Sequence, residues 1–150
     1  MVAIKIGDVF EVNTSKGKAY IHYVCNDKEI GELIRVLPGL FTEDLINLEE
    51  LVSLKERYCV YFPLSFGYKK GLIKRVDNFS IEKYEKPQFM RSEHNIRGEF
   101  LGWHIVSTDS WERKLVKELT EEQKKYSPWG VWNDTLLIER LENDWKLESW

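Results

Sequence analysis

The sequence predicts a mainly β protein of the α+β class, with a curled antiparallel sheet or a small, partly open barrel of about seven strands and two short helices. Three observations lead to this prediction. Short apolar and aromatic segments recur along the chain, turn-forming residues separate them, and only two stretches carry clear helix signals. The 150 residues suit one domain, which we place over residues 1–150.

Three strands are expected in the first third of the chain, over residues 7–14, 20–25 and 32–37. Gly17 lies in the first turn, where it can adopt a positive φ, and Pro38 ends the third strand. Turns this short join strands that pair with each other. The segment therefore predicts an antiparallel meander.

A helix is expected next, because Leu45, Leu48, Leu51 and Val52 recur at steps of three and four residues. Thr42 is predicted to be its N-cap, since a threonine hydroxyl can accept a hydrogen bond from a free N–H group of the first turn.

The middle of the chain is less regular. Strands are expected over residues 58–62 and 100–106, where β-branched and aromatic residues gather. Glycines at 67 and 71 conflict with the helical spacing of the apolar residues around them. The sequence therefore predicts no definite element over residues 64–99.

The C-terminal third is predicted to hold two more strands. Residues 111–119 fit both a helix and a strand, and we favour a strand because residues 120–123 form a capping box that begins a separate short helix. Pro128 ends that helix. Residues 135–141 are predicted as the last strand, largely buried on both faces.

Charge and the N-terminal sequence narrow the class of protein. A net charge of -3 from 22 basic and 25 acidic residues gives no overall field that would bind nucleic acid. The N-terminus lacks a secretory signal pattern, and no apolar run approaches the roughly 20 residues of a membrane span. We expect a cytoplasmic protein without membrane contact, in which Cys25 and Cys59 form no disulfide.

No residues have the spacing of a catalytic or cofactor site. His22 and Cys25 lie three residues apart on one predicted strand, so their side chains point to opposite faces. The histidines and cysteines lack the spacing of zinc ligands, and no phosphate-binding glycine loop occurs. We expect no enzyme activity, no metal and no cofactor.

A basic segment leaves a second function open, namely nucleic-acid binding by a β-barrel module. Rings that stack on bases alternate there with cations that bind phosphates, although a solvated sheet edge is the simpler interpretation. The residues of this segment are Phe66, Tyr68, Lys69, Lys70, Lys74 and Arg75.

The six tryptophans all lie in the C-terminal third, and two of them, Trp103 and Trp111, are expected in the core. The other notable pair occupies the turn-prone segment SPWGVWND. Two interpretations of this pair stay open: rigid anchors for a partner, or a loop folded down as a lid. The predicted partner-binding residues are Trp129, Trp132, Asn133 and Asp134, with Arg91, His94 and Arg97 as flanking polar contacts.

Several segments together resemble the bacterial immunity protein 26 family. They are KIGDVFEV, GELIRVLPG, FPL, RGEFLGWHIV and LTEEQKKYSPWGVWNDTLLIERL, followed by the final tryptophan. The resemblance extends over nearly all of the chain. It implies a small, mostly β, cytoplasmic protein that protects its own cell by binding a cognate protein toxin of a polymorphic toxin system.

The expected function is therefore that of a non-catalytic immunity protein. An inhibitor of this kind needs a stable scaffold with rigid anchors and no chemistry of its own. Many toxin domains are basic nucleases, and acidic side chains would steer their association. The acidic residues considered for this role are Glu43, Asp44, Glu49 and Glu50.

Overall fold

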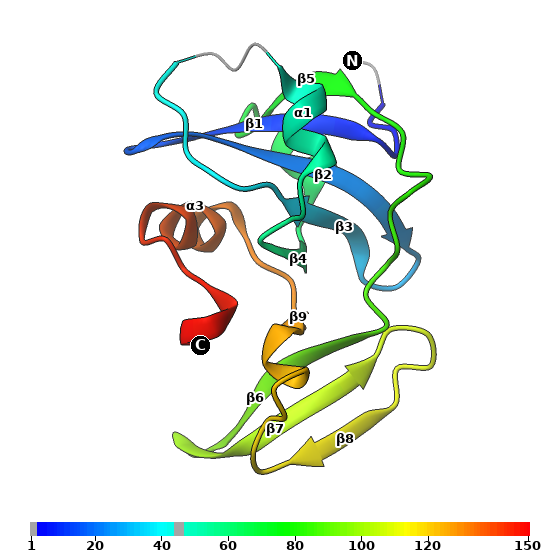
Figure 1. Ribbon diagram of the computed structural model, residues 1–150, viewed down its shortest axis with the longest axis vertical. Coiled ribbons are helices and arrows are strands. Elements are labelled where there is room, and N and C mark those ends of the chain that lie inside the picture. Colours follow the sequence, from blue (N-terminus) through cyan, green and yellow to red (C-terminus); the bar gives the residue numbers. More distant parts are fainter. Residues whose placement is uncertain (1–2, 44–46) are drawn as a thin grey trace.

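The computed structural model describes residues 3–43 and 47–150, in which nine strands form two sheets accompanied by three short α-helices (Figure 1). The mainly β prediction is confirmed. The sheets do not close into a barrel, which agrees with the predicted curled sheet.

The larger sheet, sheet A, contains the predicted meander. Its five antiparallel strands have the order β4-β3-β2-β1-β5. Gly17 opens the second strand with a φ of +135°, and a Cβ there would lie 3.0 Å from the Phe41 carbonyl oxygen, so glycine is required. The strands are β1 (Asp8–Thr14), β2 (Gly17–Asp27), β3 (Gly31–Val36), β4 (Tyr58–Tyr61) and β5 (Lys74–Asn78).

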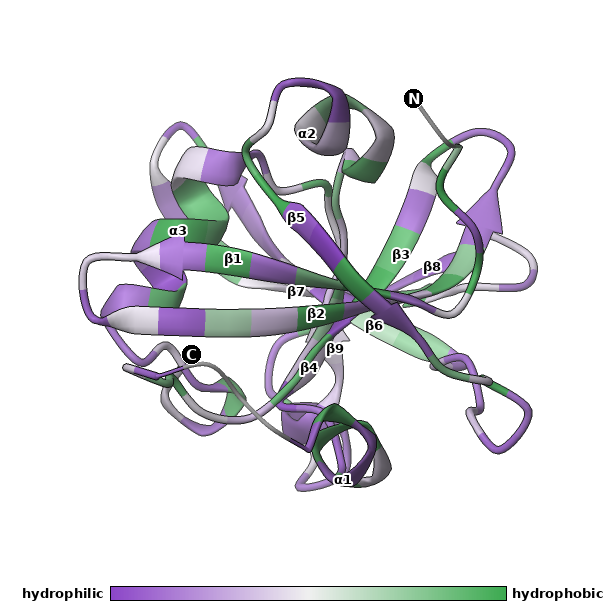
Figure 2. Cartoon of the chain, turned by 90° about the horizontal axis from the view of Figure 1, so that it is seen from above, coloured by the Kyte–Doolittle hydropathy of each residue, from purple (hydrophilic) through white to green (hydrophobic). Residues whose placement is uncertain are grey.

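Sheet A is buried on both faces. Phe10 and Ile34 point to one face, against helix α3 (Asp134–Glu142). Val9 and Tyr20 point to the other, against helix α1 (Leu48–Ser53). Figure 2 shows these two helices on opposite sides of β1 and β2. Two-sided burial explains why the strands read as nearly continuous apolar runs.

The smaller sheet, sheet B, has the order β8-β7-β6-β9. A cluster that includes Leu33, Tyr61 and Met90 joins its inner end to sheet A. Its other end, with the β6–β7 turn, points away from sheet A (Figure 1). The strands are β6 (Phe89–Ile96), β7 (Glu99–Ser107), β8 (Arg113–Val116) and β9 (Ser127–Pro128), with only β9 pairing in parallel.

The first helix begins later than predicted. It starts at Leu48, and the Asn47 side chain accepts the hydrogen bond from the Glu50 N–H at 3.0 Å, so Asn47 and not Thr42 is the N-cap. Asparagine ranks above threonine at this position. Leu45 and Asp44 lie outside the described residues.

The predicted strand over residues 135–141 is wrong, because this segment is helix α3. Its buried side chains, Leu137 and Leu141, are four residues apart, which is the spacing of one helix face. Asn133 caps the helix by accepting the Leu136 N–H at 2.8 Å. A run of apolar residues fits both periods, and the N-cap was the signal that distinguished them.

The remaining predictions in the C-terminal third are confirmed in shorter form. Strand β8 lies within residues 111–119. Thr120 and Gln123 exchange the two hydrogen bonds of a capping box, at 3.0 and 3.1 Å, and a 3₁₀ turn (Gln123–Lys125) follows. A second 3₁₀ turn spans Leu147–Ser149.

The segment 64–99, for which the sequence predicts nothing definite, supplies helix α2 (Leu64–Lys69) and strands β5 and β6. No helix in the described part of the chain is both long enough and apolar enough to cross a bilayer.

Candidate functional site

The predicted tryptophan anchor is folded inward. Trp132 is only 7% exposed and belongs to the core cluster beneath α3. Trp129 is half-buried and packs on Tyr61 with ring centroids 5.8 Å apart. Its backbone N–H donates to the Arg91 carbonyl at 2.7 Å. The lid interpretation therefore describes this loop, and the surface-anchor interpretation is wrong for Trp132.

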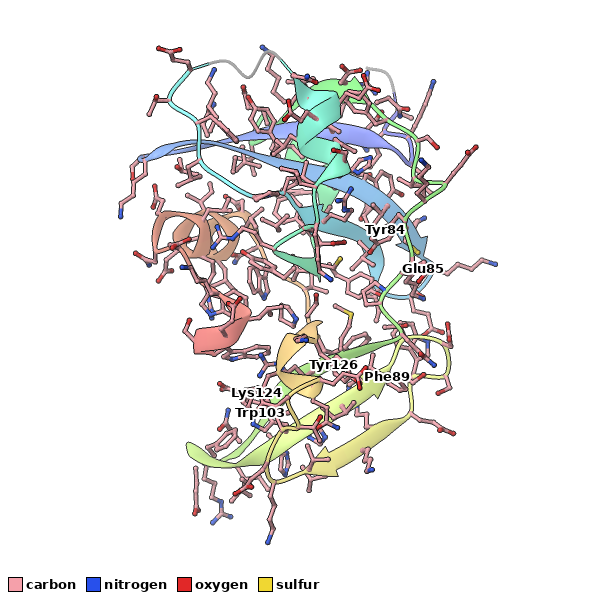
Figure 3. All side chains as sticks on the ribbon, viewed as in Figure 1. Tyr84, Glu85, Phe89, Trp103, Lys124 and Tyr126 are labelled. Carbon is pink, nitrogen blue, oxygen red and sulfur yellow. The ribbon has the colours of Figure 1, made fainter. Side chains whose placement is uncertain are left out.

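Arg91 is also unavailable to a partner, because it is fully buried. Its guanidinium packs against the rings of Trp103 and Trp150, 4.7 and 4.2 Å from their centroids, and the two rings contact each other at 5.0 Å. Figure 3 labels Trp103, Lys124 and Tyr126, which surround this position. The Arg91 guanidinium donates hydrogen bonds to the carbonyls of Tyr126, Lys124 and Leu147 at 3.0 to 3.2 Å. Desolvation lowers the pKa of Arg91 to about 10.

Arg91 is part of a seam of stacked aromatic and cationic side chains. From Trp150 the seam continues to Trp145, at 5.4 Å between ring centroids, and then to Arg140 and Trp132. It joins sheet B, the C-terminal segment and α3. Trp103 is buried as predicted, whereas Trp111 is half-buried and packs on Trp129 at 5.0 Å. The tryptophan density is thus mainly internal packing.

Asn133 and Asp134 have a local role. Asn133 is the N-cap of α3, and Asp134 lies in its first turn, where its charge favours the positive end of the helix dipole. These contacts account for both residues without a partner.

The last two predicted residues, His94 and Arg97, lie at the free end of sheet B. Arg97 is exposed and occupies the β6–β7 turn with a φ of +51°. Four large apolar side chains of β6, β7 and β8 in this outer part of sheet B are 40–53% exposed. We call these four residues, together with Arg97, the distal patch; the four are Ile96, Phe100, Leu101 and Leu115.

The distal patch covers both faces of the sheet end. His94 and Ile96 are two residues apart on β6 and share a face. Leu115 lies on that same face, since it pairs with His104, which pairs with Ser92. Phe100 lies on the opposite face, where it packs on Trp103 at 5.5 Å.

Sequence reasoning singled out Arg97 but missed the apolar side chains beside it. A usable signal was present: apolar residues flank the Arg97-Gly98 turn, with Ile96 before it and Phe100 and Leu101 after it. On the outer half of a hairpin, this pattern leaves apolar side chains in contact with water.

The basic segment is only partly free. Arg75 lies 5.3 Å from the Tyr68 ring centroid and forms an ion pair with Asp8 at 3.4 Å. Phe66 is 53% exposed, and Lys70 lies 5.9 Å from its ring centroid. One stacking ring and the exposed lysines at 69, 70 and 74 remain for a nucleic acid, and this function stays a prediction.

Two hollows lie on the α1 side of the molecule. A groove of about 920 Å³ runs between α1 and the β5–β6 connection, and its lining carries both signs of charge: Glu49, Glu56, Glu82 and Glu85 with Arg35, Lys55 and Lys83. A smaller hollow of about 330 Å³ lies between the two sheets, near Tyr84, Phe89 and Tyr126 (Figure 3).

The thiol at the smaller hollow is a poor nucleophile. Cys59 is buried and lies 3.1 Å from the Tyr84 hydroxyl. Burial raises the pKa of this thiol to about 12, so almost none is thiolate at neutral pH. Both Cys59 and Cys25 are free cysteines.

Comparisons with protein-family models, curated proteins and solved structures find no match to this chain. The resemblance to the immunity protein 26 family therefore stays a prediction.

Proposed function

We propose that this protein is a non-catalytic immunity protein, which binds a cognate bacterial toxin by protein-protein contact at the distal patch. The observation that carries the proposal is the gathering of four large apolar side chains, each 40–53% exposed, at the end of one hairpin and its neighbouring strand. The resemblance to the immunity protein 26 family supplies the kind of partner.

The distal patch has the composition of a protein interface. Fully burying one large apolar side chain contributes about 1.5–3 kcal/mol, and roughly half of each of these side chains still faces water. Exposed charged residues at 97, 99, 113 and 114 lie on the same strands and turn. Apolar side chains interspersed with charged ones are usual in a protein-binding surface.

The acidic residues considered for steering a basic toxin include Glu49 and Glu50, which are exposed in the first turn of α1. Exposed acidic side chains increase the association rate of a basic partner and make that rate sensitive to salt. The groove beside α1 adds little to this effect, because Lys55 and Lys83 line it together with the glutamates.

The test is capture and neutralisation in the source bacterium. The tagged chain should retain one stoichiometric protein with a toxin domain, and co-expression of the chain should restore growth of cells that produce that toxin. Substituting Ile96→Asp and Leu115→Asp together should abolish both effects, since two charges would replace exposed apolar side chains on the face that they share.

Leu54→Asp is the matched control, because Leu54 is 48% exposed and lies on the α1 side, away from the distal patch. This variant should capture and protect as well as the original chain. Loss of capture in the control alone would place the interface at the groove beside α1, which Leu54 lines. Retention of nucleic acid that salt releases, without any protein, would support the alternative function.

A further inference from the structure

Two imidazoles meet on the face of sheet B that carries Ile96 and Leu115. His94 lies on β6 and His104 on β7, in antiparallel strands. His94 is directly opposite Gly102, and His104 is two residues beyond Gly102, so the two histidines are diagonal neighbours on one face.

Gly102, opposite His94, is fixed by the backbone. Its φ is +142°, and a Cβ there would lie 2.5 Å from the Val116 carbonyl oxygen, so no other residue fits the backbone. The position opposite His94 therefore carries no side chain. A side chain at Gly102 would meet the Val116 backbone, so the strand register alone brings the two imidazoles together, with ring centroids 4.5 Å apart.

The two facing nitrogens have the separation of neighbouring metal ligands. His94 Nδ1 and His104 Nε2 are 2.9 Å apart. Two nitrogens bonded to one cation at about 2.05 Å lie about 2.9 Å apart at the roughly 90° angle of square-planar or tetragonal Ni²⁺ and Cu²⁺, and about 3.3 Å apart at the tetrahedral angle of Zn²⁺. Without a cation, the same nitrogens share a proton in a hydrogen bond.

We propose that His94 Nδ1 and His104 Nε2 form a two-ligand site for a first-row divalent cation such as Zn²⁺, Ni²⁺ or Cu²⁺. Imidazole nitrogen binds these ions in preference to Mg²⁺ and Ca²⁺, which take oxygen ligands. When a cation binds, the proton between the rings moves to the other ring nitrogen of the donor imidazole, and both rings stay neutral.

The surroundings keep His104 in its ligating form. Desolvation, followed by the charges of His94 and Arg113, lowers the pKa of His104, which favours the neutral ring. Its other nitrogen, Nδ1, is buried without a hydrogen-bond partner among the described residues, so Nε2 is the nitrogen available to a ligand.

The site is open and its affinity is modest. The described residues contain no group of three or more His, Cys, Asp or Glu side chains that would complete a closed metal site. Water therefore fills the remaining positions of the cation. The missing partner on His104 Nδ1 also removes the outer support that strengthens metal-bound histidines.

The experiment is a calorimetric titration of the untagged full chain with Zn²⁺ alone, and separately with Ni²⁺ alone, near neutral pH. One cation should bind per chain, and Mg²⁺ should give no binding. His94→Gln and His104→Gln should each lower the affinity at least about tenfold, because each removes one of two ligands.

Ser92→Ala is the matched control, since Ser92 lies on the same face opposite His104 and carries no imidazole. It should keep the original affinity. His22 is present in every variant, so it cannot account for a loss. In a nuclear magnetic resonance spectrum, Ni²⁺ should broaden the His94 and His104 signals before any others.

The site is overturned if neither cation binds saturably, or if His94→Gln binds as tightly as the original chain. His94→Gln decides the result even if His104→Gln disturbs the sheet, because His94 faces the glycine and is half-buried. No partner enters the experiment, so its outcome is independent of the proposed function.

Discussion

Sheet A and the free end of sheet B differ in how their side chains meet water. In sheet A, Phe10, Ile21 and Ile34 on one face and Val9 on the other are all 0% exposed. At the free end of sheet B, Ile96 is 49% exposed in the same kind of backbone. The first sheet is covered by helices on both faces, and the end of the second is not.

Two polar residues of sheet A, His22 and Arg35, are also buried and are hydrogen-bonded to each other. Arg35 donates hydrogen bonds to His22 Nδ1 at 3.1 Å and to the carbonyls of Val52 and Leu54 at the end of α1. Arginine can only donate, so His22 Nδ1 accepts, and His22 Nε2–H donates to the Phe79 carbonyl at 3.1 Å. Sheet A is therefore the scaffold, and the exposed apolar end of sheet B is the part free to act on another molecule.

The largest effect on stability is expected for Ile34→Ala in sheet A. This substitution leaves a cavity between the sheet and α3, and we expect it to lower the free energy of unfolding by about 2–5 kcal/mol. Urea unfolding followed by tryptophan fluorescence measures the effect. A loss below about 1 kcal/mol would show that sheet A is not the tightly packed region.

Arg91→Ala tests the seam that joins the two regions. It leaves three carbonyls without their donor and removes the guanidinium that packs on Trp103 and Trp150. We therefore expect the free energy of unfolding to fall by about 2–4 kcal/mol. Arg91→Lys should recover only part of it, because an ammonium group cannot reproduce the planar fork. Full recovery by lysine would contradict the geometric role of the guanidinium.

His22 predicts a pH dependence that originates in sheet A. Burial, the largest cause, lowers the pKa of His22 below its usual value of 6.5, so the unfolded chain binds its proton more readily. Stability is therefore complete above pH 6.5 and falls as the pH drops below it, by at most about 1.4 kcal/mol per pH unit for one group.

His22→Gln should flatten this slope, because glutamine offers one acceptor and one donor but does not titrate. The measurement is the urea midpoint of both proteins at a series of pH values. His104 remains in both, so its own contribution cancels in the difference. An unchanged slope would assign the effect to other groups.

The sequence predicted the elements whose signals are local. The meander and the capping box at Thr120 depend on turns and on neighbouring residues, and both were found. Helix α3 was mistaken for a strand because its apolar residues fit both periods, and packing against sheet A selects the helix. Strand β6 carries the buried Arg91, whose cost is offset only by distant carbonyls that no local pattern reveals.

The candidate site could be predicted only where local sequence indicates exposure. Arg97 was predicted as a flanking polar contact and is exposed, whereas Trp132 was predicted on the surface and is buried. Loop residues between a proline and a helix cap look exposed in sequence. Here the backbone N–H of Trp132 donates to the Tyr61 carbonyl at 2.9 Å, and the indole is buried in the core.

The smallest effect on stability is expected for Ile96→Ala, the counterpart of Ile34→Ala at the free end of sheet B. The chemistry of the two substitutions is identical, and both sites are in strands, so they differ chiefly in exposure, 49% against 0%. We expect the free energy of unfolding to change by no more than about 0.5 kcal/mol, measured in the same urea series. If Ile96→Ala also weakened toxin capture, the distal patch would be a surface maintained for binding and not for folding. A loss comparable to that of Ile34→Ala would instead place Ile96 in the scaffold, and the distinction between the two regions would fail.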